Sequence, residues 1–310
     1  MIPRELIGPL RAALPDADLD AATALGEGWA QVALRVPASG GDFVLWHPLL
    51  RNYDNAQHPD LRAMAIADLE REAKLLPELL AHGLPVPTEM LLLRDNDGRT
   101  IGSIHRLLEG DPITRSMLVG GRRKRLATAL AEFFTRLHSF PSDRTTEPGL
   151  KSIDLWDDHY RPLVEGCRPL LATRSREWLD ATVGRFLDEG GMAGSPRVLI
   201  HADIGPEHLR VDAGGAFAGS IDFGDAMVAD PALDFAGLLL AYRAPFMEQV
   251  LARYGGEIDA NLRRRAQFYA DVVALHSVEY GDFVVDGQER IGGLRRIAVR
   301  AAAAARRATR

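Results

Sequence analysis

The chain is poor in cysteine, in lysine and in long hydrophobic runs. Its single cysteine, Cys167, excludes an internal disulfide and favours a reducing, cytoplasmic environment. The most apolar stretch, residues 232–240, contains Asp234 and is far shorter than the roughly 20 residues that a membrane span needs. Residues 1–14 carry charges and prolines where a signal peptide needs an apolar core. We therefore expect a soluble cytoplasmic protein without a membrane partner.

Lysine is scarce although basic residues are common. Of the 37 basic residues in the 310-residue chain, only Lys74, Lys124 and Lys151 are lysines, which fits an arginine-rich composition bias. Any function that requires a lysine therefore has three candidates. The 46% hydrophobic and 26% charged residues exclude a disordered chain. The net charge of −6 argues against a general nucleic-acid partner.

The pattern of hydrophobic residues predicts two parts of different character. The first part alternates like β-strands at 30–36, 43–46, 89–93 and 100–107, around one amphipathic helix at 60–82. After a Gly-Asp-Pro break at 110–112, helices are expected at 122–138, 153–171, 174–188, 232–242, 245–254, 260–279 and 288–308, with short strands at 197–200, 209–211 and 217–221. We therefore expect an α+β protein with a small β-rich N-lobe, residues 1–108, and a large mainly helical C-lobe, residues 109–310.

Carboxylates and histidines gather between residues 201 and 225. His201, Asp203 and His208 follow one expected strand, and Asp222 opens a D-F-G-D sequence after another. Phosphoryl transfer needs one aspartate that accepts or orients the hydroxyl proton, and another that holds Mg²⁺ against the phosphates. Mg²⁺ prefers oxygen ligands, so Asp222 suits this second role. A metal hydrolase built on the same residues is an alternative, although the sequence has no second metal-binding motif.

This stretch resembles the hallmark of the aminoglycoside phosphotransferase family, distant relatives of the protein kinases. The loop from His201 to His208 is similar to H-G-D-x-x-x-x-N, the segment at Asp222 to I-D-x-x-D, and residues 230–235 to G-D-P-x-x-D-[LF]-A. Further similarities lie at residues 26–29, at Glu72 and at Leu137-His138. The resemblance spans about residues 20–280 and implies a two-lobed, protein-kinase-like fold.

The resemblance implies a catalytic role for several residues. Asp203 would be the catalytic base, Asp222 the main metal ligand and His208 the second metal-ligand position. Asp225 and Asp234 match acidic positions that support the loop. The implied activity is transfer of a γ-phosphoryl group from ATP or GTP, with Mg²⁺, to a hydroxyl of a small molecule. Such an enzyme is expected in antibiotic resistance.

The resemblance also implies a nucleotide site. Arg106, Leu107 and Leu108 match the hinge whose backbone meets the purine, and Ile221 lies beside Asp222 at the same site. Two residues past the metal position, relatives place an apolar residue under the purine. Arg210 occupies that position, where it would stack on the base, reach a phosphate or turn toward solvent.

The main departure from the family concerns its N-lobe lysine, which holds phosphates and pairs with a helix glutamate. That position falls at Trp46, and Lys74 lies on a different helix face from Glu72. Arg35, on the preceding strand, is the expected substitute, because a guanidinium binds phosphate through two N–H groups. The alternative for Arg35 is an ordinary surface charge, and Glu72 would then lack its usual partner.

Two smaller departures lie in the loop itself. His208 stands where asparagine is commoner, and imidazole is a poor Mg²⁺ ligand. It would bind the metal, act through a water molecule or hold the loop by hydrogen bonding. Ala202 replaces the usual glycine, which is tolerated unless the backbone φ angle is positive.

The acceptor is expected to be a small cationic molecule. Residues 201–290 contain 15 acidic and 7 basic residues, and an acidic cleft attracts cations such as aminoglycosides. Candidate walls of the acceptor site are His276, Glu279, Tyr280 and Asp282, or Trp156, Asp157, Asp158 and Tyr160. A metabolite kinase of the choline or homoserine kinase type shares the same motifs. A catalytically weak or inactive kinase-like binding module is the other alternative, favoured by Trp46, His208 and Arg210.

Overall fold

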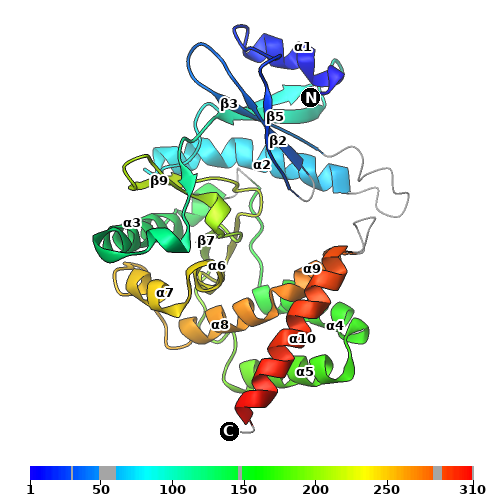
Figure 1. Ribbon diagram of the computed structural model, residues 1–310, viewed down its shortest axis with the longest axis vertical. Helices are drawn as coiled ribbons and strands as arrows, with labels where there is room; N and C mark the ends of the chain where they lie inside the picture. The colour runs from blue at the N-terminus through cyan, green and yellow to red at the C-terminus, as the bar shows by residue number, and fades with distance from the viewer. Residues whose placement is uncertain (29–30, 49–60, 146–148, 282–287, 309–310) are drawn as a thin grey trace.

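The two expected lobes are visible in the arrangement of the elements. The structure, a computed structural model, describes residues 1–28, 31–48, 61–145, 149–281 and 288–308. Figure 1 shows a sheet with the N-terminus at one end of the molecule and a bundle of helices with the C-terminus at the other. Trp29, Asp60 and Asp282, which the sequence analysis uses, lie outside the described residues.

The amino-terminal lobe is built on a five-stranded antiparallel sheet in the order β1-β2-β3-β5-β4. Its strands are β1 (Thr23–Glu27), β2 (Gln31–Val36), β3 (Phe43–Pro48), β4 (Leu91–Arg94) and β5 (Thr100–Arg106). The expected hairpin is found in β2 and β3, and β4 and β5 form a second hairpin around the Asp95–Arg99 turn. Strand β1 pairs with β2 and forms one edge of the sheet.

Two helices cover the two faces of this sheet. Helix α1 (Arg4–Ala13) lies on one face, where the buried side chains are Leu6, Leu10, Leu34, Leu45 and Ile104. Because strand residues alternate between faces, Gln31, Ala33 and Arg35 lie on the other face. Helix α2 (Leu61–Ala81) covers that side, and the Gln31 side chain donates to the Ala65 carbonyl oxygen.

The carboxy-terminal lobe consists mainly of helices. They are α3 (Gly120–His138), α4 (Arg161–Cys167), α5 (Thr173–Asp188), α6 (Ala232–Tyr242), α7 (Ala244–Leu251), α8 (Leu262–Val272), α9 (Ala274–Tyr280) and α10 (Gln288–Ala308). Two small sheets lie among them, β6-β8-β9 and β10-β7. Their strands are β6 (Asp111–Pro112), β7 (Val198–Ile200), β8 (Leu209–Val211), β9 (Phe217–Ser220) and β10 (Met227–Ala229).

The segment expected as one helix at 153–171 is divided into three pieces. A π-helix (Leu155–Tyr160) precedes α4, and a short 3-10 helix (Arg168–Leu170) follows it. The Asp154 carboxylate accepts hydrogen bonds from two backbone N–H groups at the start of the π-helix. Pro162 and Pro169 each lie at the start of a piece, because proline cannot donate the hydrogen bond that a continuous helix needs.

Helix α2 links the two lobes through its buried residues. Leu75, Leu76 and Leu79 belong to the core of the carboxy-terminal lobe, although α2 also covers the sheet. Strand β5 ends at Arg106, and the next strand, β6, already pairs with β8. The division after residue 108 stays a prediction, and this change of partner occurs close to it.

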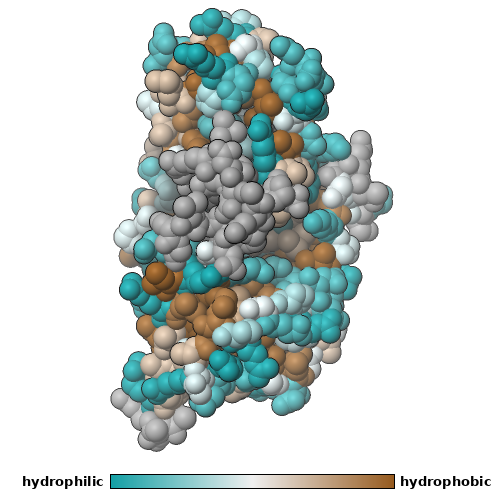
Figure 2. Space-filling model, turned by 90° about the vertical axis from the view of Figure 1, so that its right-hand side faces the viewer, coloured by the Kyte–Doolittle hydropathy of each residue, from teal (hydrophilic) through white to brown (hydrophobic). Residues whose placement is uncertain are grey.

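The surface is mixed in character. Figure 2 shows hydrophilic residues over both lobes on one side, with hydrophobic residues gathered in the upper part of the helical lobe. Within the ranges that the structure describes, no helix has the length and apolar character needed to cross a membrane.

Candidate active site

A buried aspartate shapes the turn that carries the expected catalytic base. The backbone N–H groups of His201 and Ala202 donate to the two Asp234 carboxylate oxygens at 3.0 and 2.9 Å. His138 lies against the same carboxylate, with its Nε2 at 3.1 Å. Asp234 lies in the first turn of α6 and is fully buried, so these contacts fix the turn after β7 against α3 and α6. These hydrogen bonds are consistent with the expected role of Asp234 in supporting the loop.

The same turn holds Ala202 in the left-handed backbone region, at a φ of 68°. This conformation strains a residue with a Cβ atom, and glycine adopts it freely. We expect Ala202→Gly to raise the free energy of unfolding by about 0.5–1 kcal/mol, because released strain exceeds the entropy that glycine adds to the unfolded chain. Urea unfolding measures this change.

The control is Ala252→Gly, at an exposed residue with an ordinary φ of −63°. This control lowers stability, since glycine there gains nothing in the folded state. A loss of stability in both variants would show that the turn carries no strain.

Asp203, His208 and Asp222 converge at one point. His208 Nδ1 lies 2.6 Å from the Asp203 carbonyl oxygen, which can only accept, so Nδ1 carries a proton. His208 Nε2 then faces Asp222 Oδ2 at 3.5 Å, and Nδ1 is 3.4 Å from Asp203 Oδ2. Burial disfavours the charged imidazole, but the two carboxylates outweigh it and raise the pKa of His208. His208 therefore bridges the two aspartates that phosphoryl transfer needs.

The exposure of these side chains differs in a useful way. The Asp203 carboxylate is 54% exposed and the Asp222 carboxylate 40%, whereas His208 is 13% exposed. Both carboxylates are therefore accessible to a ligand, while the His208 imidazole lies between them and is mostly buried.

Helix α2 holds the turn that presents Asp222. Asp222 itself has a φ of 66°, a strained value for a residue with a side chain. The Phe223 N–H donates to Glu72 Oε1 at 3.1 Å, and the Arg71 guanidinium donates to the Gly224 carbonyl oxygen. Glu72 therefore has a backbone partner where the family pairs it with a lysine. Arg71 was not predicted, and its place beside Glu72 is the only signal for it in the sequence.

Crowding of carboxylates shifts several pKa values upward. Burial, with repulsion from Asp222, raises the pKa of Glu72 to about 8. Asp225 keeps a solvent-exposed edge, yet desolvation by the surrounding protein and the charges of Asp203 and Asp222 raise its pKa to about 7. Desolvation also raises the pKa of Asp68, on α2. A cation bound at this end of the cleft would relieve the repulsion and favour the ionised forms of these carboxyl groups.

The donor set fits Mg²⁺ in part. In the described part of the chain, no group of three or more His, Cys, Asp or Glu side chains is arranged to hold a metal ion. In phosphoryl-transfer sites one or two carboxylates usually hold Mg²⁺ together with phosphates and water, so such a group is not required. The exposed Asp222 carboxylate fits this role. His208 Nε2 faces the same carboxylate, but an imidazole nitrogen suits Mg²⁺ less well.

Trp46, where the sequence analysis expects the family's lysine, lies on the cleft side of the sheet. It pairs with Ala33 and Ser103 across the sheet. Its indole Nε1–H donates to His105 Nε2 at 3.0 Å. Burial lowers the pKa of His105, so this imidazole is neutral. The Trp46–His105 pair therefore offers no positive charge to a phosphate.

Arg35 is engaged away from the glycine-rich turn. Its guanidinium forms an ion pair with Asp42, in the β2–β3 hairpin. The turn between β1 and β2 closes through a bond from Gly28 N–H to the Gln31 carbonyl, and Arg35 lies four residues further, about 13 Å along the strand. The contact of Arg35 with a nucleotide phosphate stays a prediction. The ion pair with Asp42 does not favour it, because it holds the guanidinium at the hairpin.

We expect Arg35→Ala to change the nucleotide KM by less than about twofold, because an exposed ion pair contributes little. Steady-state kinetics with varied nucleotide checks this. A rise of about tenfold would instead assign the phosphate contact to Arg35.

Some polar groups of the expected hinge, residues 106–108, already bond to other residues of the N-lobe. The Arg106 side chain pairs with Glu89 at 2.6 Å and faces outward. The Leu107 N–H donates to the Asp42 carbonyl oxygen at 2.9 Å. Among the hydrogen bonds of the described residues, none uses the backbone of Leu108, so its N–H and carbonyl can meet a purine.

Ile221 and Arg210 both lie at the β8–β9 pair, where the register pairs Arg210 with Gly219. The Ile221 N–H donates to the His208 carbonyl oxygen, and its own carbonyl lies 3.0 Å from His201 Nε2. Arg210 Nη1 donates to the Glu207 carbonyl oxygen at 3.3 Å, while its buried Nε has no partner among the described residues. Ile221 thus ties the loop to the Asp222 turn, and Arg210 is held along β8.

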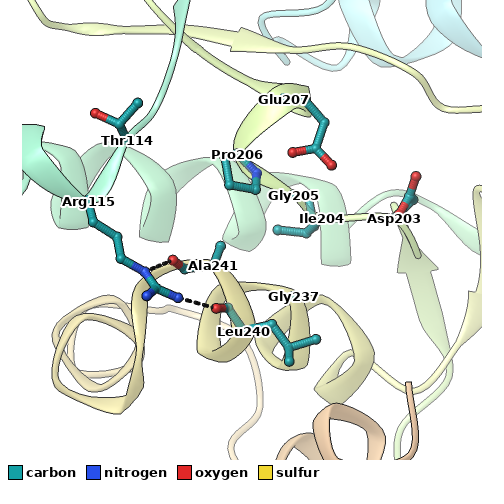
Figure 3. Close-up of a pocket in the computed structure, with 10 residues that line it drawn as sticks. All are labelled: Thr114, Arg115, Asp203, Ile204, Gly205, Pro206, Glu207, Gly237, Leu240 and Ala241. Atoms are coloured by element: carbon teal, nitrogen blue, oxygen red, sulfur yellow. Dashed lines mark hydrogen bonds between the residues drawn. The ribbon is translucent and has the colours of Figure 1, made fainter. Parts of the chain in front are cut away.

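A pocket of about 530 Å³ opens beside Asp203 (Figure 3). It lies between the catalytic loop, the 3-10 turn at Arg115–Met117 and the end of α6. Its lining residues are Thr114, Arg115, Asp203, Ile204, Gly205, Pro206, Glu207, Gly237, Leu240 and Ala241. The volume falls in the range typical of small-molecule sites, and Asp203, the expected catalytic base, is one of its lining residues.

Among the described residues, those of the expected acceptor walls are not found in the lining of this pocket. Tyr160 is buried in the core, and Trp156 packs against the aromatic rings of Phe186 and Phe268. The His276 ring stacks on the His159 ring, with the two ring centroids 5.0 Å apart. Of the pocket residues, the sequence analysis assigned a role to Asp203 only. Residues 204–207 occupy the variable positions of the loop motif, and the others are distant in sequence.

Comparison with known proteins agrees with this arrangement. The model of the phosphotransferase enzyme family matches residues 21–269, about four fifths of the chain. The chain belongs to the phosphotransferase enzyme family. This membership confirms the expected resemblance and the expected enzyme class, a small-molecule phosphotransferase.

Solved structures of phosphotransferases share the fold. The GDP and kanamycin complex of APH(2")-IIia is 24% identical, covers 95% of this chain and 97% of its own, and has a TM-score of 0.81. The macrolide 2'-phosphotransferase MphH from Brachybacterium faecium is 19% identical, covers 94% and 97%, and has a TM-score of 0.70. The expected two-lobed, kinase-like α+β fold is thereby confirmed.

A curated relative adds little about function. The protein YcbJ of Bacillus subtilis (strain 168), which is uncharacterized, is 32% identical over 98 residues. The match spans 29% of this chain and 30% of the relative's length.

Proposed function

We propose that this phosphotransferase moves the γ-phosphoryl group of ATP or GTP to a hydroxyl of a small cationic molecule of the aminoglycoside type. The observation that carries the proposal is the convergence of Asp203 and Asp222 on either side of His208, at the edge of the 530 Å³ pocket. A nucleotide on the Asp222 side and an acceptor in the pocket would then meet at Asp203.

Each residue of the cleft has a role in this proposal. Asp203 accepts or orients the proton of the acceptor hydroxyl. Asp222 holds Mg²⁺, with His208 at the second position, and the bound ion would neutralise charge on the phosphates. Glu72 keeps the Asp222 turn in place through the Phe223 N–H. Asp225 and Asp234 support the loop and the turn.

The nucleotide is proposed to bind between the sheet and the β8–β9 pair. The backbone of Leu108, beside Arg106 and Leu107, receives the purine. Ile221 lies next to the phosphates, and Arg210 approaches the base or a phosphate from β8. The reaction is placed in the cytoplasm, where nucleoside triphosphates are available, and a role in antibiotic resistance is proposed from the kanamycin complex of a protein with the same fold.

The test is a transfer assay with ATP or GTP, with and without Mg²⁺. Kanamycin and a macrolide serve as acceptors, together with small hydroxyl compounds such as choline and homoserine. Phosphorylated product that depends on Mg²⁺ supports the proposal. Absence of nucleotide binding overturns it.

A second candidate is a kinase-like binding module without activity. The Trp46–His105 pair favours it, because the N-lobe lysine that holds phosphates is replaced by uncharged side chains. Tight nucleotide binding without transfer to any acceptor would support this candidate.

A further inference from the structure

The acceptor pocket contains a carboxylate that the proposed reaction does not use. Glu207 lies four residues after Asp203 in the same loop and is exposed to solvent. Figure 3 shows the two side chains extending from neighbouring points of this loop. No cation forms an ion pair with the Glu207 carboxylate among the residues that the structure describes. An exposed anion is therefore available to a ligand beside the catalytic base.

A glycine makes room for this carboxylate. A Cβ atom at Gly205 would lie 2.5 Å from Glu207 Oε1 and 2.7 Å from its carboxyl carbon. Gly205 has an ordinary φ of −132°, so its backbone would tolerate another residue. The Arg210 guanidinium donates to the Glu207 carbonyl oxygen and so holds the backbone of Glu207 in place. The missing side chain of Gly205 thus allows the carboxylate to lie over the loop.

The cationic side chain in the pocket lining is turned away. Arg115 donates from its guanidinium to the carbonyl oxygens of Leu240 and Ala241, with Nη2 2.7 Å from the Leu240 oxygen. These carbonyls end α6, where the helix dipole is negative and stabilises a cation. Figure 3 shows the guanidinium directed to this helix end and away from Asp203 and Glu207. The two carboxylates therefore determine the charge that an acceptor meets.

We propose that Glu207 is the specificity-determining residue of the acceptor site and binds a protonated amine of the acceptor while Asp203 faces its hydroxyl. The inference rests on the proposed function and adds a requirement to it. The acceptor must carry an ammonium group close to the hydroxyl that is phosphorylated, as an amino sugar does. An uncharged hydroxyl compound of the same size would lose this contact.

The experiment compares Glu207→Gln, Glu207→Asp and wild type with kanamycin and with fully N-acetylated kanamycin. Glu207→Gln is expected to raise the kanamycin KM and Kd about tenfold or more, because a hydrogen bond to a charged group is lost. The values for the acetylated compound and for the nucleotide stay unchanged, and Glu207→Asp restores part of the kanamycin affinity. The matched control is Glu132→Gln, an exposed glutamate on α3 outside this pocket, which leaves both values unchanged.

A second variant tests the position of the carboxylate without removing its charge. Gly205→Ala displaces the Glu207 carboxylate and is expected to weaken kanamycin binding in the wild-type background. It has no further effect on kanamycin binding in the Glu207→Gln background, because the two changes act through one contact. Additive effects of the two changes would overturn this coupling.

Binding is measured by calorimetry, so the inference and the proposed function can fail separately. Glu207-dependent binding of kanamycin supports the inference, even where no phosphate is transferred and the proposed function fails. Equal binding to wild type and Glu207→Gln overturns the inference, as does absence of binding. Transfer to uncharged hydroxyl compounds without binding of kanamycin overturns the inference and leaves phosphotransferase activity standing.

Discussion

Replacement of Asp203 by asparagine is expected to lower kcat for phosphoryl transfer by about 10²- to 10⁴-fold, with little change in the nucleotide KM. Asparagine keeps the shape of the side chain but cannot take a proton from the acceptor hydroxyl. The fold should survive, because the Asp203 side chain is 54% exposed and Asp234 holds the preceding turn through backbone N–H groups. Steady-state kinetics with varied acceptor and nucleotide measures the change.

The matched control is Asp97→Asn, which removes the same charge from an exposed residue in the turn between β4 and β5. Its kcat stays at the wild-type value. A kcat for Asp203→Asn within about tenfold of wild type would contradict the assignment of Asp203 as the base, since a positioned base contributes more than this.

The largest effect on stability is expected from Arg265. This side chain is fully buried on α8, and it pairs with Asp230 and Asp259, each at 2.6 Å. The two carboxylates outweigh burial and raise the pKa of Arg265. Arg265→Met leaves the Asp230 charge buried, and the partners that remain to it among the described residues are the Tyr269 hydroxyl and the Ala232 N–H. We expect the free energy of unfolding to fall by about 3–5 kcal/mol.

Arg264 provides the control on the same helix. It is 59% exposed and lies 3.6 Å from Glu189, so Arg264→Met should cost less than about 1 kcal/mol. Urea unfolding of both variants measures the difference. Equal losses would show that the buried pairs contribute no more than an exposed one.

Elements with strong local periodicity were predicted well from the sequence, and elements that depend on partners were not. Helix α3 follows its expected amphipathic pattern closely. Helix α1 contains Pro9 and is stabilised by Leu6 and Leu10 against the sheet, which local pattern does not reveal. Strand β10 has three residues and exists through its pairing with β7. Short elements of this kind acquire their structure from contacts far away in the sequence.

The candidate site divides in the same way. Asp203, His208 and Asp222 lie in two short motifs, so the sequence could place them together. The partner of Glu72 is Phe223, 151 positions away, and no local pattern predicts that bond. The lining of the pocket could not be predicted for the same reason, because Arg115 and Ala241 are far apart in the sequence and come into contact in the folded chain. Pairing across such distances is decided by the tertiary structure.

The bonds from α2 to the Asp222 turn have a consequence for the order in which the site is completed during synthesis. Glu72 and Arg71 leave the ribosome before the turn that they hold, by 151 and 153 positions. At usual rates of translation the delay is on the order of ten seconds, long compared with helix formation. Until then the Glu72 carboxyl, buried in the finished protein, remains open to water. The site is therefore completed late in synthesis, when the Asp222 turn of the C-lobe binds to helix α2, which was made earlier.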